Sequence, residues 1–175
     1  IVDDEKSIRQ TLEGILQDEG FKTLTAETGE NCLSMLKEEN PDLILLDIWM
    51  PGIDGLETLK RIRDLNTEQM VLMMSGHGTI QTAVQATKLG AYDFIEKPLS
   101  IEKLLLSINN ALKIGSLVEE NRELKAQIKK DYEIVGESPP IQELKKRIEL
   151  ASPTSGWVLI TGDNGTGKEL VARAI

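Results

Sequence analysis

Short apolar runs alternate with amphipathic stretches along the first two thirds of the sequence. The apolar runs predict β-strands at residues 1–3, 22–26, 43–47, 70–75 and 92–95. Between them, apolar residues recur every three or four positions, which predicts helices at residues 6–19, 30–38, 56–65, 80–89 and 101–112. Strands that alternate with helices form a parallel sheet with helices on both faces. The pattern therefore predicts an α/β fold of the flavodoxin-like type, with strand order 2-1-3-4-5.

Polar residues stand at the ends of four of these strands. Asp3 and Asp4 end the first strand, Asp47 the third and Ser75 the fourth, while Lys97 follows the fifth. Ligands bind outside the carboxyl ends of such strands, so we expect these side chains to meet at one edge of the sheet. Taken singly, each aspartate could be a helix cap, the serine a turn residue and the lysine a solvated surface residue. Their joint placement favours a shared site.

Three neighbouring carboxylates repel one another unless a cation lies among them. Oxygen ligands suit a hard divalent ion, which predicts Mg²⁺ bound by this acidic group. Asp47 would then act as a nucleophile that accepts a phosphoryl group, while Mg²⁺ and Lys97 stabilise the phosphoryl oxygens. The Ser75 hydroxyl would donate to one of those oxygens. Lys97-Pro98 suits a rigid turn, compatible with a cis peptide bond, that fixes the lysine.

Composition narrows the class of protein. The 175 residues are 40% hydrophobic and 28% charged, which suits globular material amounting to one domain and part of another. A net charge of −9 disfavours a general nucleic-acid-binding surface. A single cysteine, Cys32, fits a reducing cytoplasm and the packing of a small apolar residue. No signal peptide or run long enough for a membrane span is visible, and we expect both ends of the chain to be incomplete.

A long helical pattern follows the last strand and contains no proline between residues 101 and 130. Apolar spacing of three and four continues in a seam made of Ile114, Leu117, Asn121, Leu124 and Ile128. This seam predicts a parallel two-stranded coiled coil in which Asn121, at an a position, selects the register. A single solvated connector helix is the alternative, because two heptads are few.

A glycine-rich segment lies near the carboxyl end. Residues 157–161 predict a buried strand that leads into Gly162, Asp163, Asn164, Gly165, Thr166, Gly167, Lys168 and Glu169. Gly-x-x-x-x-Gly-Lys between a strand and a helix is a phosphate-binding loop, whose N–H groups surround the phosphates of ATP while Lys168 reaches them. Glu169 stands where a hydroxyl would touch Mg²⁺, which indicates contact through water.

Both parts of the chain resemble known families. "VDDE", "LLDIWMPGIDG", "MMSGHG" and "AYDFIEKP" resemble the receiver domain of two-component response regulators. The resemblance implies a sensor histidine kinase as phosphoryl donor and Asp47 as acceptor. It also implies Mg²⁺ ligation by Asp4, Asp47 and the carbonyl of Trp49, with Asp3 assisting through water, and a conformational switch at Ser75 and Phe94. His77, in "SGHG", is expected to be a loop or helix-entry residue.

"GDNGTGKE" and the upstream "IVGESPPIQELKKRI" resemble the start of the AAA+ domain in σ54-dependent activators of the NtrC/NtrX type. We therefore expect a receiver at residues 1–112, a dimerising helical linker at 113–133 and the first part of an AAA+ ATPase at 134–175. The resemblance implies contacts of the longer protein with σ54 RNA polymerase and DNA. It also implies ATP and Mg²⁺ as ligands, although this chain alone is not expected to hydrolyse ATP.

Three rival functions make different predictions. A phosphatase of the haloacid-dehalogenase type would need a second aspartate two positions after Asp47, where Trp49 stands. A plain nucleotide-binding enzyme leaves the polar strand ends unexplained. A non-catalytic dimerisation module would take up no phosphoryl group from a small acyl phosphate in the presence of Mg²⁺.

Overall fold

A computed structural model describes residues 1–76, 79–131, 134–154 and 156–175, with the backbone only for residues 126–131. His77, expected in a loop or at a helix entry, therefore lies outside the described residues. The chain divides into two compact units, Ile1–Val118 and Glu119–Ile175. The first unit is longer than the 112 residues expected for it, because the helix that follows the last strand continues to pack on the sheet. Gly115 of this helix lies against the side chain of Met70.

The first unit contains a parallel sheet of three strands in the order β1 (Leu43–Asp47), β2 (Met70–Ser75) and β3 (Asp93–Glu96). Val2 forms single parallel bridges to Ala26 on one side and Leu46 on the other. The segments at residues 1–3 and 22–26, expected as full strands, are thus reduced to isolated bridges. Toward β1, the Val2 N–H donates to Leu45 O and its carbonyl accepts from Asp47 N–H, both at 2.8 Å; on the other side, Ala26 N–H donates to Ile1 O at 2.9 Å. The predicted order 2-1-3-4-5 is confirmed.

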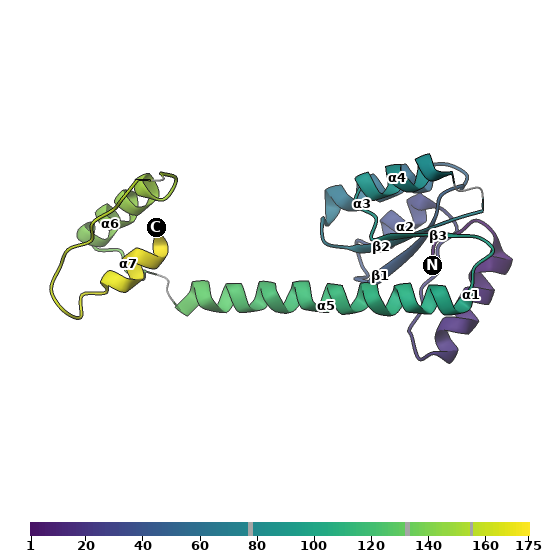
Figure 1. Cartoon of the computed structure of the whole chain (residues 1–175), viewed down its shortest axis with the longest axis horizontal. Helices are drawn as coiled ribbons and strands as arrows, with labels where there is room; N and C mark the ends of the chain where they lie inside the picture. Colours follow the sequence, from purple (N-terminus) through teal and green to yellow (C-terminus); the bar gives the residue numbers. More distant parts are fainter. Residues whose placement is uncertain (77–78, 132–133, 155) are drawn as a thin grey trace. The chain divides into compact units, whose positions relative to one another are not determined.

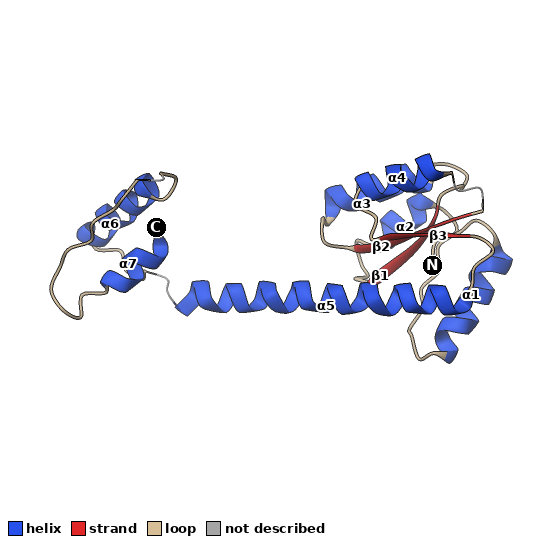
Figure 2. Cartoon of the chain, in the orientation of Figure 1, coloured by secondary structure: helices blue, strands red, loops and turns tan. Residues whose placement is uncertain are grey.

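Helices cover both faces of the sheet, as Figure 1 and Figure 2 show. On one face lie α2 (Gly29–Met35), α3 (Gly55–Leu65) and α4 (Ile80–Lys88); on the other lie α1 (Lys6–Asp18) and the first part of α5 (Ile101–Asp131). Alternate residues of each strand point to opposite faces, so the strands supply two separate cores. The first core includes Ile44, Leu46, Leu59, Ile62, Val71 and Met73, and the second includes Leu12, Leu16, Leu45, Leu72, Met74 and Leu104.

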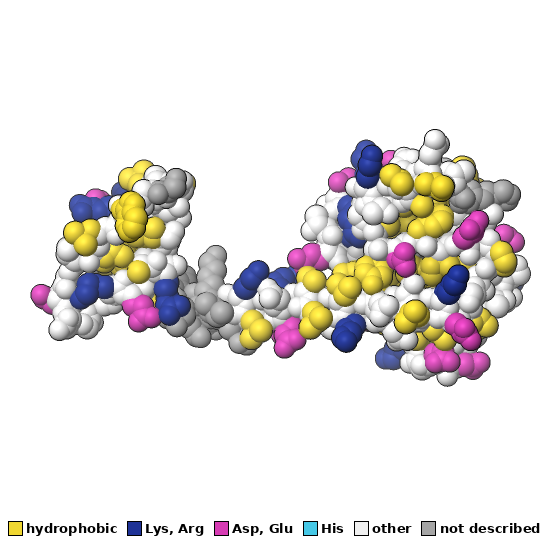
Figure 3. Space-filling model, viewed as in Figure 1, with side chains coloured by type: hydrophobic (Ala, Val, Ile, Leu, Met, Phe, Trp, Pro, Cys, Tyr) yellow, Lys and Arg dark blue, Asp and Glu magenta, His cyan; other side chains and the backbone are white. Residues whose placement is uncertain are grey.

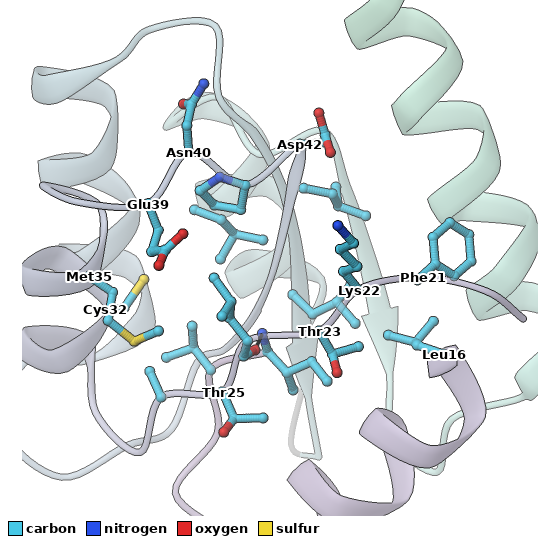
Figure 4. A pocket seen from close by; sticks show the side chains of 18 of the residues that line it. Leu16, Phe21, Lys22, Thr23, Thr25, Cys32, Met35, Glu39, Asn40 and Asp42 are labelled. Atoms are coloured by element: carbon cyan, nitrogen blue, oxygen red, sulfur yellow. Dashed lines mark hydrogen bonds between the residues drawn. The ribbon is translucent and has the colours of Figure 1, made fainter. Parts of the chain in front are cut away.

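A hollow in the first unit lies away from the carboxyl ends of the strands. It has a volume of about 520 Å³ and separates residues 22–25 from the amino end of β1 (Figure 4). Most of its lining is apolar, with Cys32 and Met35 on one wall and Leu16 and Phe21 on another. It is a gap beside the isolated bridges of Val2 and contains none of the polar residues that end the strands.

The second unit contains the end of α5, together with α6 (Pro139–Ala151) and α7 (Lys168–Ala174). The prediction of a buried strand at residues 157–161 is wrong, because this segment has no strand structure and Trp157 and Leu159 are exposed. A strand needs a neighbour for its backbone groups, and the described part of this unit offers none. Figure 3 shows hydrophobic side chains on the surface of this unit. Within the described residues, every helix is too short or too polar to cross a membrane.

Candidate functional site

Lys97 joins the two buried carboxylates at the carboxyl ends of the strands. Its Nζ lies 2.7 Å from Oδ2 of Asp3 and 2.6 Å from Oδ1 of Asp47. Lys97 follows β3 directly, its backbone N–H donates to Ser75 O at 2.7 Å, and its peptide bond to Pro98 is cis, as the sequence allowed. The structure therefore brings together residues from three separate strand ends around one ammonium group.

Asp47 ends β1 with only 3% of its surface exposed. Its Oδ2 accepts a hydrogen bond of 2.8 Å from the backbone N–H of Trp49. Its Oδ1 contacts Lys97 as an ion pair. Among the buried side-chain nitrogen and oxygen atoms of the described residues, it is the one that does not meet the geometry of a hydrogen bond. Burial raises the pKa of Asp47, an effect that Lys97 opposes and the nearby Asp3 reinforces. An electron-rich carboxylate oxygen with capacity for another ligand thus lies at the edge of the sheet.

The same contacts act on the lysine. Burial would lower the pKa of Lys97, but its bonds to Asp3 and Asp47 outweigh that effect, so the pKa is raised. Its side chain is 15% exposed, which leaves the ammonium charged and partly shielded from water. A charged, shielded ammonium beside a carboxylate can stabilise further negative charge arriving at that carboxylate.

Asp3 and Asp4 differ in how deeply they are buried. Asp3 is fully buried, and its Oδ1 accepts from the backbone N–H of Glu5 at 3.0 Å. Asp4 is exposed. Among the described residues, no three acidic, histidine or cysteine side chains lie close enough together to hold a metal ion. The expected convergence of three carboxylates is therefore met by two, with Lys97 between them.

The donor set nevertheless suits a divalent cation in its chemistry. The two carboxylates of Asp3 and Asp47 against one ammonium leave one negative charge, and oxygen ligands are those that Mg²⁺ prefers. Oδ1 of Asp47 has unused acceptor capacity. Asp4, next to Asp3 in the chain, is exposed to solvent.

Ser75 and Phe94 occupy the neighbouring strands β2 and β3, which follow β1 and its Asp47 in strand order. Ser75 ends β2 with its side chain fully buried. Phe94 pairs in register with Met73 and packs, partly buried, against the core beneath α4. Both residues lie where a change at Asp47 could reach the face of the sheet that carries α4.

The loop after Asp47 is held by contacts that the sequence did not reveal. A Cβ at Gly55 would come within 2.1 Å of Asp47 O, so α3 begins against the backbone of Asp47. Glu30 accepts from Ile53 N–H at 3.1 Å and holds the far side of the loop. Arg9 is buried on α1 among leucines, bonded to the backbone of the acidic pair. The sequence feature that could have identified Arg9 is a charged residue on the apolar face of a predicted helix.

The glycine-rich segment forms a loop that leads into α7. Gly165 and Gly167 have φ values of 80° and 81°, a region that glycine adopts without strain. Lys168 begins α7, and its Nζ donates to Gly162 O at 2.8 Å and also to Asp163 O. Thr166 Oγ1 donates to Asp163 O at 2.8 Å. The lysine is thus folded over the loop, on carbonyl groups that a phosphate would replace as its partners.

Comparisons with known proteins agree with this geometry. Residues 1–109 match the response regulator receiver domain, and residues 134–175 match the sigma-54 interaction domain. The nitrogen assimilation regulatory protein NtrX of Azorhizobium caulinodans is 45% identical over all of this chain, which covers 39% of that protein. The chain therefore spans well under half the length of this relative.

Solved structures give the same match. The crystal structure of NtrX from Brucella abortus in complex with ATP is 44% identical, with a TM-score of 0.67 over 99% of this chain and 38% of that one. The beryllofluoride-activated NtrC4 receiver domain dimer, a solution structure, is 41% identical, with a TM-score of 0.63 over 65% of this chain and 94% of that one. The similarity includes both the sheet and the glycine-rich segment.

Proposed function

Since the chain belongs to the response regulator receiver family and matches part of the sigma-54 interaction domain, we propose that a sensor histidine kinase phosphorylates it on Asp47. We propose further that this controls a σ54-dependent AAA+ transcription activator. The ion pair of 2.6 Å between Lys97 and Asp47 is the observation that carries the proposal. This ion pair places a cation beside a buried carboxylate whose Oδ1 can accept a further ligand.

The chain's own residues would carry out most of the transfer. A carboxylate oxygen of Asp47 attacks phosphorus, the phosphorus–nitrogen bond of the phosphohistidine breaks, and the released imidazole takes a proton from solvent. Lys97 then holds an oxygen of the new phosphoryl group, and Ser75 donates its hydroxyl to another. Asp3, Asp4, Asp47 and the carbonyl of Trp49 would hold Mg²⁺, which supplies charge neutralisation for the phosphoryl oxygens.

Phosphorylation would act through two neighbouring strands. A phosphoryl group that recruits Ser75 moves the end of β2, and Phe94, paired in register with Met73 of that strand, would repack beneath α4. Asp93, the residue before Phe94, accepts a hydrogen bond of 3.0 Å from Ser107 Oγ of α5. This bond supports a route from the switch to the linker helix.

The linker helix supports self-association. Ile114, Leu117 and Leu124 are 42%, 54% and 50% exposed, so the apolar seam of α5 is uncovered in the single chain. Burying such a seam against a second copy stabilises a parallel coiled coil, with Asn121 selecting the register. A dimer of receivers would then hold two AAA+ domains together, and the similarity to an activated receiver dimer agrees with this proposal.

The glycine-rich segment at residues 162–169 would bind ATP with Mg²⁺ in the longer protein. The loop glycines and Lys168 support this assignment, as does the similarity to NtrX from Brucella abortus, which was crystallised in complex with ATP. Contacts with σ54 RNA polymerase and DNA, ring assembly and a cytoplasmic location belong to the same proposal. The match to a sigma-54 interaction domain supports this part of the proposal.

Mass spectrometry of the intact chain tests the proposal. Incubation with Mg²⁺ and a small acyl phosphate should add one phosphoryl group per chain, and Asp47→Asn should prevent it. Asp54→Asn is the matched control, because Asp54 lies in the same loop but only caps α3, accepting from Glu57 N–H at 2.7 Å. Equal phosphorylation of the unmutated chain and Asp47→Asn would refute the assignment of the acceptor.

A further inference from the structure

Arg9 is a buried cation on the apolar side of α1. It is 7% exposed and shares that side of the helix with Leu12 and Leu16, at 3% and 6%. A buried guanidinium is costly unless its donors are satisfied, and an apolar side chain would fill the same space without that cost. Its only ion-pair partner among the described residues is Glu27, whose side chain is 70% exposed. Core packing alone therefore does not explain an arginine here.

The Arg9 guanidinium donates hydrogen bonds to the backbone of Asp3 and Asp4. Nη1 donates to the backbone carbonyl of Asp3 at 2.7 Å and to that of Asp4 at 2.9 Å, while Nη2 donates to Glu27 at 2.7 Å. Hydrogen bonds from a charged donor are stronger than neutral ones, and the planar fork of arginine fixes direction as well as distance. Two successive carbonyls are thus turned toward α1, which fixes the backbone from which both carboxylates extend.

The Asp3 carboxylate is fixed by hydrogen bonds, whereas the Asp4 carboxylate is exposed. The Asp3 carboxylate accepts from Glu5 N–H at 3.0 Å and from Lys97 at 2.7 Å. Within the described residues, the Asp4 carboxylate forms no comparable hydrogen bond or ion pair. Its position therefore depends on its backbone, and Arg9 is the side chain that holds the carbonyl of that residue.

We propose that Arg9 is a positioning residue for the Mg²⁺ site, acting through the Asp3 and Asp4 carbonyls to hold the acidic pair ready to receive the ion. The inference rests on the proposed function, because it concerns the same site. Residues that orient metal ligands change metal affinity by about 10- to 100-fold when they are replaced. Arg9 would lower the Mg²⁺ concentration needed for half-saturation without taking part in phosphoryl transfer.

Fluorescence of Trp49 supplies a measurement of Mg²⁺ binding that does not depend on phosphorylation. Trp49 is 58% exposed and its backbone N–H is bonded to Asp47, so an ion at Asp47 changes its surroundings. Trp157, which is fully exposed, is replaced by phenylalanine in all variants to remove its signal. Titration of the full chain with MgCl2 then gives Kd, and circular dichroism gives the thermal unfolding midpoint of each variant.

Arg9→Met should raise the Kd for Mg²⁺ by about tenfold. The phosphorylation rate with an acyl phosphate should need correspondingly more Mg²⁺ but should stay within about twofold at saturation, a split that general destabilisation would not produce. Arg9→Lys should raise Kd by only about threefold, since an ammonium keeps the charge but lacks the planar fork. Arg61→Met, which removes an exposed ion pair with Glu57, is the matched control and should leave Kd unchanged.

Folded Arg9→Met with a Kd within twofold of the unmutated chain would overturn the inference. Should Arg9→Met fail to fold, Arg9→Lys decides, and an unchanged Kd in that variant has the same consequence. If the chain with Arg9 intact shows no Mg²⁺-dependent change in Trp49 fluorescence and no phosphorylation, both the inference and the proposed function are wrong. Phosphorylation with an unaltered Mg²⁺ requirement in both Arg9 variants contradicts the inference alone.

Discussion

The ammonium group of Lys97 lies 2.6 Å from Oδ1 of Asp47 and 2.7 Å from Oδ2 of Asp3. One cation therefore compensates two carboxylates that are almost completely buried, at 4% and 0% side-chain exposure. Burying two carboxylates so close together is costly unless a cation lies beside them. The same arrangement that makes the site chemically useful also makes it a weak point of the fold.

Replacing Lys97 should therefore destabilise the chain strongly. Lys97→Met leaves two neighbouring buried carboxylates without their cation, which should lower the free energy of unfolding by about 3–5 kcal/mol. Urea denaturation at neutral pH measures the loss. Lys103→Met, which removes an exposed lysine of α5, should change it by less than about 0.5 kcal/mol. Adding Asp47→Asn to Lys97→Met should recover part of the loss, and full additivity of the two changes would argue against the ion pair.

The raised pKa of Asp47 predicts a specific dependence on pH. The folded state holds a proton on Asp47 at pH values where the unfolded chain, with an ordinary pKa of 3.8, has lost it. The stability due to this proton is complete below pH 3.8 and is lost as pH rises through the raised pKa. Asp47→Asn should therefore gain stability relative to the unmutated chain as pH rises through that range. Thermal unfolding midpoints from about pH 3 to about pH 7 check the sign, and a difference independent of pH would contradict it.

Gly55 should tolerate no side chain. A Cβ there would meet Asp47 O at 2.1 Å and Ile48 Cα at 2.7 Å, so Gly55→Ala must displace either α3 or the end of β1. We expect a loss of about 1–3 kcal/mol in unfolding free energy, together with slower phosphorylation. Gly14→Ala is the matched control, since Gly14 lies inside α1 with no atom within 4 Å of a Cβ. That change should instead stabilise the helix by about 0.5–1 kcal/mol.

The seam of α5 predicts an association that depends on concentration. Sedimentation equilibrium should show dimers of the unmutated chain, because Leu117 and Leu124 are half exposed in the single chain. Leu117→Lys should shift the mass to that of a monomer, since it places a charge in the centre of the seam. Ser116→Lys, on the outer side of the same turn, should leave the dimer intact. A monomer mass for the unmutated chain at all concentrations would favour a solvated connector helix.

The order of the strands and the identity of the residues at their ends could be predicted from the sequence. Apolar runs with Asp47, Ser75 and Lys97 at their ends specify both the sheet and the edge where those side chains meet. Whether residues 1–3 and 22–26 would pair as full strands could not be predicted, because that depends on neighbouring backbone rather than on side-chain pattern. The prediction of a strand at residues 157–161 failed for the same reason.

The residues that hold the site in place could not be predicted from the sequence pattern either. Arg9 and Glu30 act through backbone groups of other segments of the chain, and such contacts have no periodicity to read. Gly55 could be expected at the start of a helix, but its contact with Asp47 O depends on how closely α3 approaches β1. Tertiary packing decides these positions.

The most direct test of the proposed role of Asp47 is to locate the phosphoryl group within the chain. After reaction with an acyl phosphate and Mg²⁺, borohydride reduces an aspartyl-phosphate to homoserine, and the altered residue is found by peptide mass spectrometry. We predict homoserine at position 47 alone, and none when Mg²⁺ is chelated beforehand. Homoserine at another aspartate, or phosphorylation that persists without Mg²⁺, would contradict the role assigned to Asp47 and its neighbours.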